Sequence, residues 1–163
     1  MNYFKESITV EQIKQTYREL ARKFHPDLGG DLELMKLLNA QYLEALKSCD
    51  NVKTFTTDNT EYTYKFDADL ENQLIDKIHE FLGKDFKAVD LLLIGSWLWA
   101  VGSTKEVKEE LKGMSFKYHS VKKCWFYHVG KWHGKGSKTD LNDLASKYGY
   151  KSYKGILQAK IGA

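Results

Sequence analysis

The chain of 163 residues has only one proline and two cysteines, and neither cysteine belongs to a zinc or redox motif. Four possible metal ligands lie close together in the sequence: His119, Cys124, His128 and His133. Their spacing is not that of a structural zinc site, so we expect no metal. No apolar run approaches the roughly 20 residues of a membrane-spanning helix, and the N-terminus lacks the plan of a signal peptide. We therefore expect a cytoplasmic protein with no membrane partner.

The sequence also lacks the motifs of catalysis. It contains no recognisable set of nucleophile, base and acid, no glycine-rich cofactor fingerprint and no convincing pair of carboxylates. We expect neither enzymatic activity nor a cofactor, which leaves binding and interaction proteins as the remaining classes.

Charge is distributed unevenly along the chain. Residues 1–50 carry a net charge of −1, residues 51–101 carry −4 and residues 102–163 carry +8. Such asymmetry indicates two functional parts. We expect an N-terminal domain over residues 1–50 and a C-terminal domain with a basic, aromatic-rich end over residues 51–163.

The only proline, Pro26, follows a predicted helix. Thr9 and Gln12 have the spacing of a capping box, which predicts that this helix begins at Val10. Its apolar face is formed by Ile13, Tyr17, Leu20 and Phe24. Its basic residues are Lys14, Arg18, Arg22 and Lys23. Because proline disfavours helical geometry in the residue before it, we expect the helix to end near His25.

A second helix is predicted from an N-cap at Asp31 to about Lys47. Its apolar stripe is formed by Leu34, Leu38, Tyr42 and Leu46. Two amphipathic helices joined by a short loop form an antiparallel hairpin. We expect the loop of this hairpin to present His25 and Asp27 to solvent, next to a basic helical face.

The stretches "YRELARKFHPD", "GGD" and "LMKLLNAQYLEAL" together resemble a J domain, the co-chaperone module that stimulates ATP hydrolysis by chaperones of the DnaK family. The resemblance covers residues 3–47, although the first helix of the family is compressed here to "NYFKES". It implies a chaperone-binding site formed by His25, Pro26, Asp27, Lys14, Arg18, Arg22 and Lys23. Short J-domain proteins of this type are found in phages and other mobile elements.

The remainder of the chain is predicted to be an α+β domain with an antiparallel sheet and the order ββα–βαββ–α. We expect two short strands within residues 53–66, a helix at 68–82 and a single buried strand in "VDLLLIGSWLWAV". Ser103 and Glu106 predict a capping box for a short helix. Two paired strands follow, and a last helix is predicted to begin at Thr139 or Asp140 and to end at Lys147.

Six lysines and no acidic residue occur between Phe116 and Lys138, where they alternate with aromatic residues. These aromatic side chains either fill the core while the lysines protect strand edges, or stack on single-stranded nucleic acid while the lysines contact phosphates. A surface for a client protein is a third interpretation. The candidate contacts are Lys117, Lys122, Lys123, Lys131, Trp132 and Lys135.

The function expected from these observations is that of a J-domain co-chaperone, which binds a DnaK-family chaperone and stimulates its ATPase. The C-terminal domain would then target a client protein. Two alternatives stay open: a nucleic-acid-binding protein that uses the basic, aromatic region, and a factor that sequesters the host chaperone without stimulating it.

Overall fold

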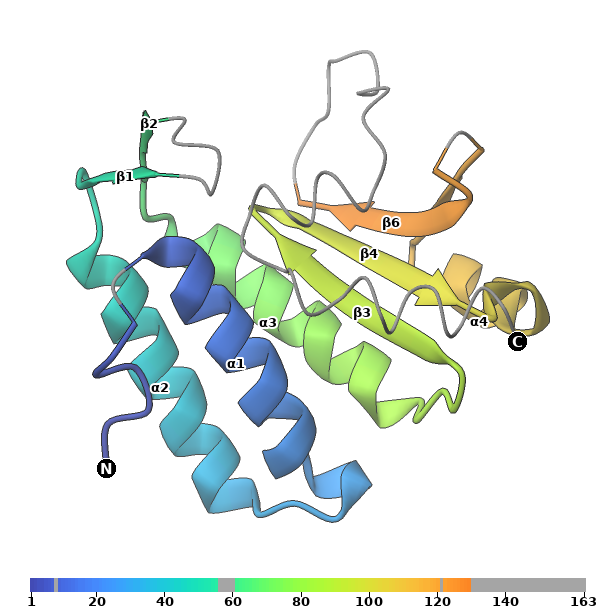
Figure 1. Ribbon diagram of the computed structural model, residues 1–163. Coiled ribbons are helices and arrows are strands. Elements are labelled where there is room, and N and C mark those ends of the chain that lie inside the picture. The colour runs from blue at the N-terminus through green and yellow to red at the C-terminus, as the bar shows by residue number, and fades with distance from the viewer. Residues whose placement is uncertain (8, 56–60, 121, 130–163) are drawn as a thin grey trace. The chain divides into compact units, whose positions relative to one another are not determined.

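The computed structural model describes residues 1–7, 9–55, 61–120 and 122–129 (Figure 1). These residues form helices and antiparallel sheets, so the fold class is α+β, as predicted. The chain divides into two compact units, Met1–Asp85 and Phe86–Ala163, which we call the N-terminal and C-terminal units. The N-terminal unit therefore extends beyond the hairpin predicted for residues 1–50. In the part of the chain that is described, no helix is long and apolar enough to cross a membrane.

The N-terminal unit is built on a hairpin of two helices, α1 (Val10–Phe24) and α2 (Leu32–Ser48), which lie side by side in Figure 1. The predicted capping box begins α1, since the Thr9 hydroxyl accepts the Gln12 N–H while the Gln12 side chain accepts the Thr9 N–H. The carboxylate of Asp31 caps α2 by accepting two backbone N–H groups of the first turn. Local sequence signals therefore set where both helices begin.

A third helix, α3 (Ala68–Gly83), completes the core of this unit. Between the hairpin helices, the rings of Tyr17 and Tyr42 stack with their centroids 4.0 Å apart. The other apolar side chains of this core include Ile13, Ala21, Met35, Leu38, Leu46, Leu74 and Ile78. Burial of each large apolar side chain stabilises the fold by about 1.5–3 kcal/mol, so α3 contributes substantially to holding the hairpin.

The first seven residues pack against the hairpin without forming a helix. The ring of Phe4 is buried 6.0 Å from that of Tyr42, and the ring of Tyr3 lies 5.5 Å from that of Phe24. Gln41 of α2 accepts the Tyr3 N–H at 2.9 Å and so fixes this segment. Two aromatic contacts and one hydrogen bond thus hold this segment against the hairpin.

A small sheet connects α2 to α3. As predicted, its strands β1 (Lys53–Phe55) and β2 (Glu61–Thr63) are short and antiparallel. Asp67 then caps α3 by accepting the Leu70 N–H. The sequence also predicts a polar turn near Asp58-Asn59, and these two residues lie outside the described residues.

The C-terminal unit contains a four-stranded antiparallel sheet with the order β3-β4-β6-β5. Its strands are β3 (Val89–Ile94), β4 (Trp97–Gly102), β5 (Lys117–His119) and β6 (Cys124–His128). Between β4 and β5 the chain forms a 3-10 turn, η2 (Thr104–Val107), and a short helix, α4 (Lys108–Gly113).

Two predictions for this unit were wrong. The segment "VDLLLIGSWLWAV" forms a hairpin of β3 and β4 rather than one strand, because Gly95 takes a φ of 60° at the first position of a two-residue turn. The capping box at Ser103 does not form, since the Ser103 side chain makes no capping hydrogen bond. The predicted helix that begins near Thr139 lies outside the described residues.

Candidate functional site

The His-Pro-Asp turn, His25–Asp27, lies where α1 ends. His25 has an extended backbone, as expected before a proline, and Pro26 begins a 3-10 turn, η1 (Pro26–Leu28). The imidazole Nδ1 of His25 caps this turn by accepting the Asp27 N–H at 3.2 Å. The His25 carbonyl accepts the N–H groups of Leu28 and Gly30 at 3.0 and 2.9 Å. Proline, imidazole and backbone therefore hold the turn in one conformation.

The expectation that both His25 and Asp27 face solvent was correct only for Asp27. His25 is 5% exposed, whereas Pro26 and Asp27 are exposed. The imidazole is buried because its ring lies against that of His79 on α3, with the centroids 5.3 Å apart. The part of the turn that a partner can reach is therefore the proline ring and the carboxylate.

The two glycines after the turn have different roles. Gly29 takes a φ of 86°, a left-handed conformation that is strained for other residues. Gly30 is needed for space, since a Cβ there would lie 2.2 Å from the backbone carbon of Phe24. Gly83, at the end of α3, also approaches the turn, because a Cβ there would lie 2.9 Å from Asp27 Oδ2.

Polar contacts connect the turn to the core of the N-terminal unit. The Tyr17 hydroxyl donates to Asn39 Oδ1 at 2.8 Å, and Asn39 Nδ2 lies 3.2 Å from Nε2 of His79. His79 in turn contacts the ring of His25. The sequence assigned His79 no role, because the contact joins residues far apart in the chain and leaves no local signal.

The basic residues of α1 do not share one exposed face. Arg22 and Lys23 are exposed in the last turn, and Arg18 is half-buried. Lys14 is 3% exposed, so it cannot form part of a docking surface as predicted. The basic face next to the turn is therefore narrower than the sequence indicated.

Lys14 instead forms a buried ion pair with Glu71 of α3, with 3.4 Å between Nζ and Oε1. The Tyr64 hydroxyl donates to the same oxygen at 2.8 Å. Burial lowers the pKa of Lys14, and the negative charge of Glu71 partly offsets this effect. Lys14 therefore has a structural role, which is to join α1 to α3.

The candidate contacts in the C-terminal unit are only partly described. Lys117 and Lys123 are exposed and Lys122 is half-buried, all in or next to the β5–β6 hairpin. Lys131, Trp132 and Lys135 lie outside the described residues. Of the aromatic residues in this region, Phe116 and Trp125 are buried, which fits the core interpretation for those two.

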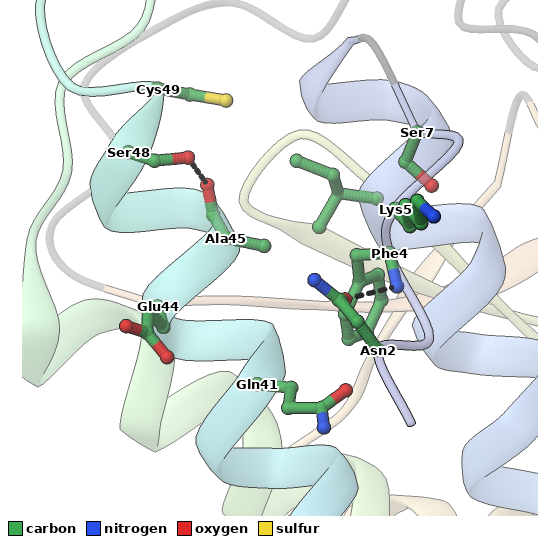
Figure 2. A pocket seen from close by; sticks show the side chains of 10 residues that line it. Asn2, Phe4, Lys5, Ser7, Gln41, Glu44, Ala45, Ser48 and Cys49 are labelled. Carbon is green, nitrogen blue, oxygen red and sulfur yellow. Dashed lines mark hydrogen bonds between the residues drawn. The ribbon is translucent and has the colours of Figure 1, made fainter.

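A pocket of about 470 Å³ lies between the first residues and α2 (Figure 2). Its lining includes Lys5, Glu44, Ser48 and Cys49. The Ser48 hydroxyl donates to the Ala45 carbonyl at 2.6 Å, and none of the described residues that line the pocket is a histidine. Among these residues, Ser48 therefore has no imidazole beside it to act as a base. Elsewhere in the described residues, no group of three metal-ligating side chains could hold a metal ion.

The contact of His79 with the turn predicts a pH-dependent stability. Burial, together with the neighbouring His25, lowers the pKa of His79 from its ordinary value of 6.5. Below pH 6.5 the unfolded chain then binds a proton that the folded chain does not, so the free energy of unfolding decreases as the pH is lowered. We expect this decrease to be smaller in His79→Gln than in the unmodified chain. Urea unfolding above and below pH 6.5 measures the decrease, and an equal decrease in both proteins would contradict the prediction.

Comparison with known proteins yields no match to a family model, to a curated protein or to a solved structure.

Proposed function

We propose that the N-terminal unit is a J-domain-type co-chaperone, which binds a DnaK-family ATPase and stimulates its hydrolysis of ATP. One observation carries the proposal: the rigid His-Pro-Asp turn lies at the end of a helical hairpin, with the Asp27 carboxylate exposed and with Arg22 and Lys23 exposed in the helical turn before it. Two buried residues hold this arrangement in place: Lys14 pairs with Glu71 of α3, and His25 caps η1.

Such a co-chaperone performs no chemistry, because it acts by binding one conformation of the ATPase better than another. A carboxylate can accept charge-assisted hydrogen bonds from an arginine of the partner. Because Pro26 and the hydrogen bonds of His25 already order the turn, docking would lose little conformational entropy. Arg22 and Lys23 would speed the encounter with an acidic surface.

The position of Asp27 also favours a binding role. Its carboxylate lies beside Gly83, the last residue of α3. The C-terminal end of a helix carries a partial negative charge, so a carboxylate there is unfavourable by a few tenths of a kcal/mol or more.

Removal of the two exposed charges of α1 tests the proposal. We expect the unmodified chain to raise the steady-state ATP turnover of a DnaK-family chaperone. Arg22→Gln with Lys23→Gln should raise the concentration needed for half-maximal stimulation about tenfold, with a weaker dependence on salt, because electrostatic steering is lost.

The matched control is Lys36→Gln with Lys47→Gln, which removes two exposed charges from α2. This variant should stimulate as well as the unmodified chain. If the two double variants behave alike, Arg22 and Lys23 do not contact the ATPase. Binding of the unmodified chain without any stimulation would instead identify a sequestering factor and overturn the proposal.

A further inference from the structure

Strand register in the C-terminal unit places five aromatic rings on one side of the sheet. Trp97 and Trp99 of β4 lie opposite His128 and Phe126 of β6. His119 of β5 is on the same side, since it pairs with Cys124, two residues before Phe126. We call these five side chains the aromatic face.

The rings of the aromatic face form a continuous group. The centroid of Trp97 lies 5.6 Å from that of Trp99, 5.4 Å from that of Phe126 and 4.3 Å from that of His128. His119 lies 6.1 Å from both Trp99 and Phe126. The indoles of Trp97 and Trp99 are nearly parallel, with 13° between their planes.

Exposure differs among the residues on this side of the sheet. Leu92, Val101 and Cys124 share the side of the aromatic face and are at most 2% exposed, and Trp99 is 4% exposed. The other four rings of the aromatic face are half-buried. Part of each of these four rings is therefore accessible to a ligand.

The aromatic face also carries polar atoms without partners. The indole Nε1 of Trp99 and the imidazole Nδ1 of His128 are buried, and neither has a hydrogen-bond partner among the described residues. A buried polar group in this state costs free energy, so the packing of this side of the sheet is not optimised for stability alone.

The histidines add neutral hydrogen-bonding groups. Burial lowers the pKa of His128, and burial together with Lys122 lowers that of His119. The lowered pKa of each ring favours its neutral form at pH 7, in which it stacks without a charge. His119 Nδ1 accepts the Lys122 N–H at 3.1 Å, which leaves Nε2 as the donor of that ring.

Lysines of the β5–β6 hairpin lie beside these rings. The stretch from Lys117 to His128 contains three lysines and no acidic residue. Lys117 shares the side of the aromatic face, because it pairs with Phe126, and Lys122 Nζ lies 6.0 Å from the ring centroid of Trp99. The acidic residue Asp90 is on this side too, where it is buried and pairs with Val101, two residues from Trp99 along β4.

We propose that the aromatic face binds single-stranded nucleic acid. Bases would stack on Trp97 and Phe126, while the phosphates contact Lys117 and Lys123. Partly exposed rings on a sheet, with lysines at its edge, are the elements of a stacking platform that binds single strands with little sequence preference. This activity is independent of the proposed co-chaperone function, and it uses residues of β4 that lie outside the basic stretch of the sequence.

Fluorescence anisotropy of labelled oligothymidylate and oligouridylate, titrated with the full chain, tests this proposal. We expect binding at low salt, accompanied by quenching of tryptophan fluorescence. Trp97→Ala and Phe126→Leu should each weaken binding about 5- to 100-fold, through the loss of stacking. Tyr118→Ala is the matched control, because Tyr118 is 53% exposed on the opposite side of the same sheet.

Salt dependence tests the lysines separately. Lys117→Gln with Lys123→Gln should reduce the slope of log affinity against log salt by about 1.4, whereas Lys105→Gln with Lys108→Gln should leave it unchanged. Absence of binding to both oligonucleotides at low salt would overturn the proposal. So would equal losses in Tyr118→Ala and Phe126→Leu, with circular dichroism showing that both variants are folded.

Discussion

Replacement of Asp27 by asparagine is expected to abolish stimulation of the partner ATPase without unfolding the protein. Asparagine has the same shape but carries no negative charge, so it cannot form an ion pair with a cationic group of the partner. Loss of one side of a desolvated charge pair at an interface costs enough to weaken binding at least about 30-fold. Steady-state ATP turnover at saturating ATP, with increasing amounts of the variant, measures the effect.

Substitution of Asp27 gives a clearer test than substitution of His25, because Asp27 is exposed and His25 is buried. Substitution of His25 would remove the cap of η1 and the ring that contacts His79, so a loss of function could reflect a damaged turn. Asp27 is exposed, and its change removes a charge beside the end of α3. We therefore expect Asp27→Asn to be as stable as the unmodified chain, or slightly more stable.

Glu44→Gln is the control for this experiment, since it neutralises an exposed carboxylate on α2. It should stimulate normally. Full stimulation by Asp27→Asn, or an equal loss in Glu44→Gln, would show that the Asp27 carboxylate is not the group that the ATPase recognises.

The second large effect concerns stability. Lys14→Met is expected to lower the free energy of unfolding by about 3–5 kcal/mol, because it leaves the Glu71 carboxylate buried without its cation. The two side chains are 4% and 2% exposed, so water cannot compensate for the lost charge. Urea unfolding followed by circular dichroism measures the change.

A double variant separates the loss of pairing from the loss of packing. Glu71→Gln keeps an acceptor for the Tyr64 hydroxyl, so Lys14→Met with Glu71→Gln should recover about 0.5–3 kcal/mol relative to the sum of the single changes. Lys36→Met is the exposed comparison, since the pair of Lys36 with Glu33 is worth at most about 1 kcal/mol. If Lys14→Met costs no more than Lys36→Met, Lys14 and Glu71 do not form a buried pair in solution.

Elements with a strong local signal were predicted well. The capping box at Thr9, the N-cap at Asp31 and the proline after His25 each depend on residues within one helical turn, and all three mark helix ends in the structure. The hairpin of β3 and β4 was missed, although Gly95-Ser96 is a dipeptide typical of a two-residue turn. The uniform hydrophobicity of the flanking strands hid that signal.

The choice between core and surface was less predictable. Leu34 was assigned to the apolar stripe of the second helix but is 39% exposed, whereas its neighbour Met35 is 2% exposed. Trp97 and Trp99 were interpreted as parts of one buried strand, although their spacing of two residues already places both on one side of a strand. Whether a side of the sheet is exposed depends on which other elements pack against it. The periodicity of one strand does not contain this information.

The sequence by itself determined the helical hairpin, its caps and the rigid His-Pro-Asp turn, because these features follow from backbone sterics and hydrogen bonds between near neighbours. Only the tertiary structure decided that Lys14 is buried, that His25 lies against His79 and that five aromatic rings share one side of a sheet. Each of these depends on contacts between segments distant in the chain. Such contacts are set by the packing of whole elements, which local patterns do not encode.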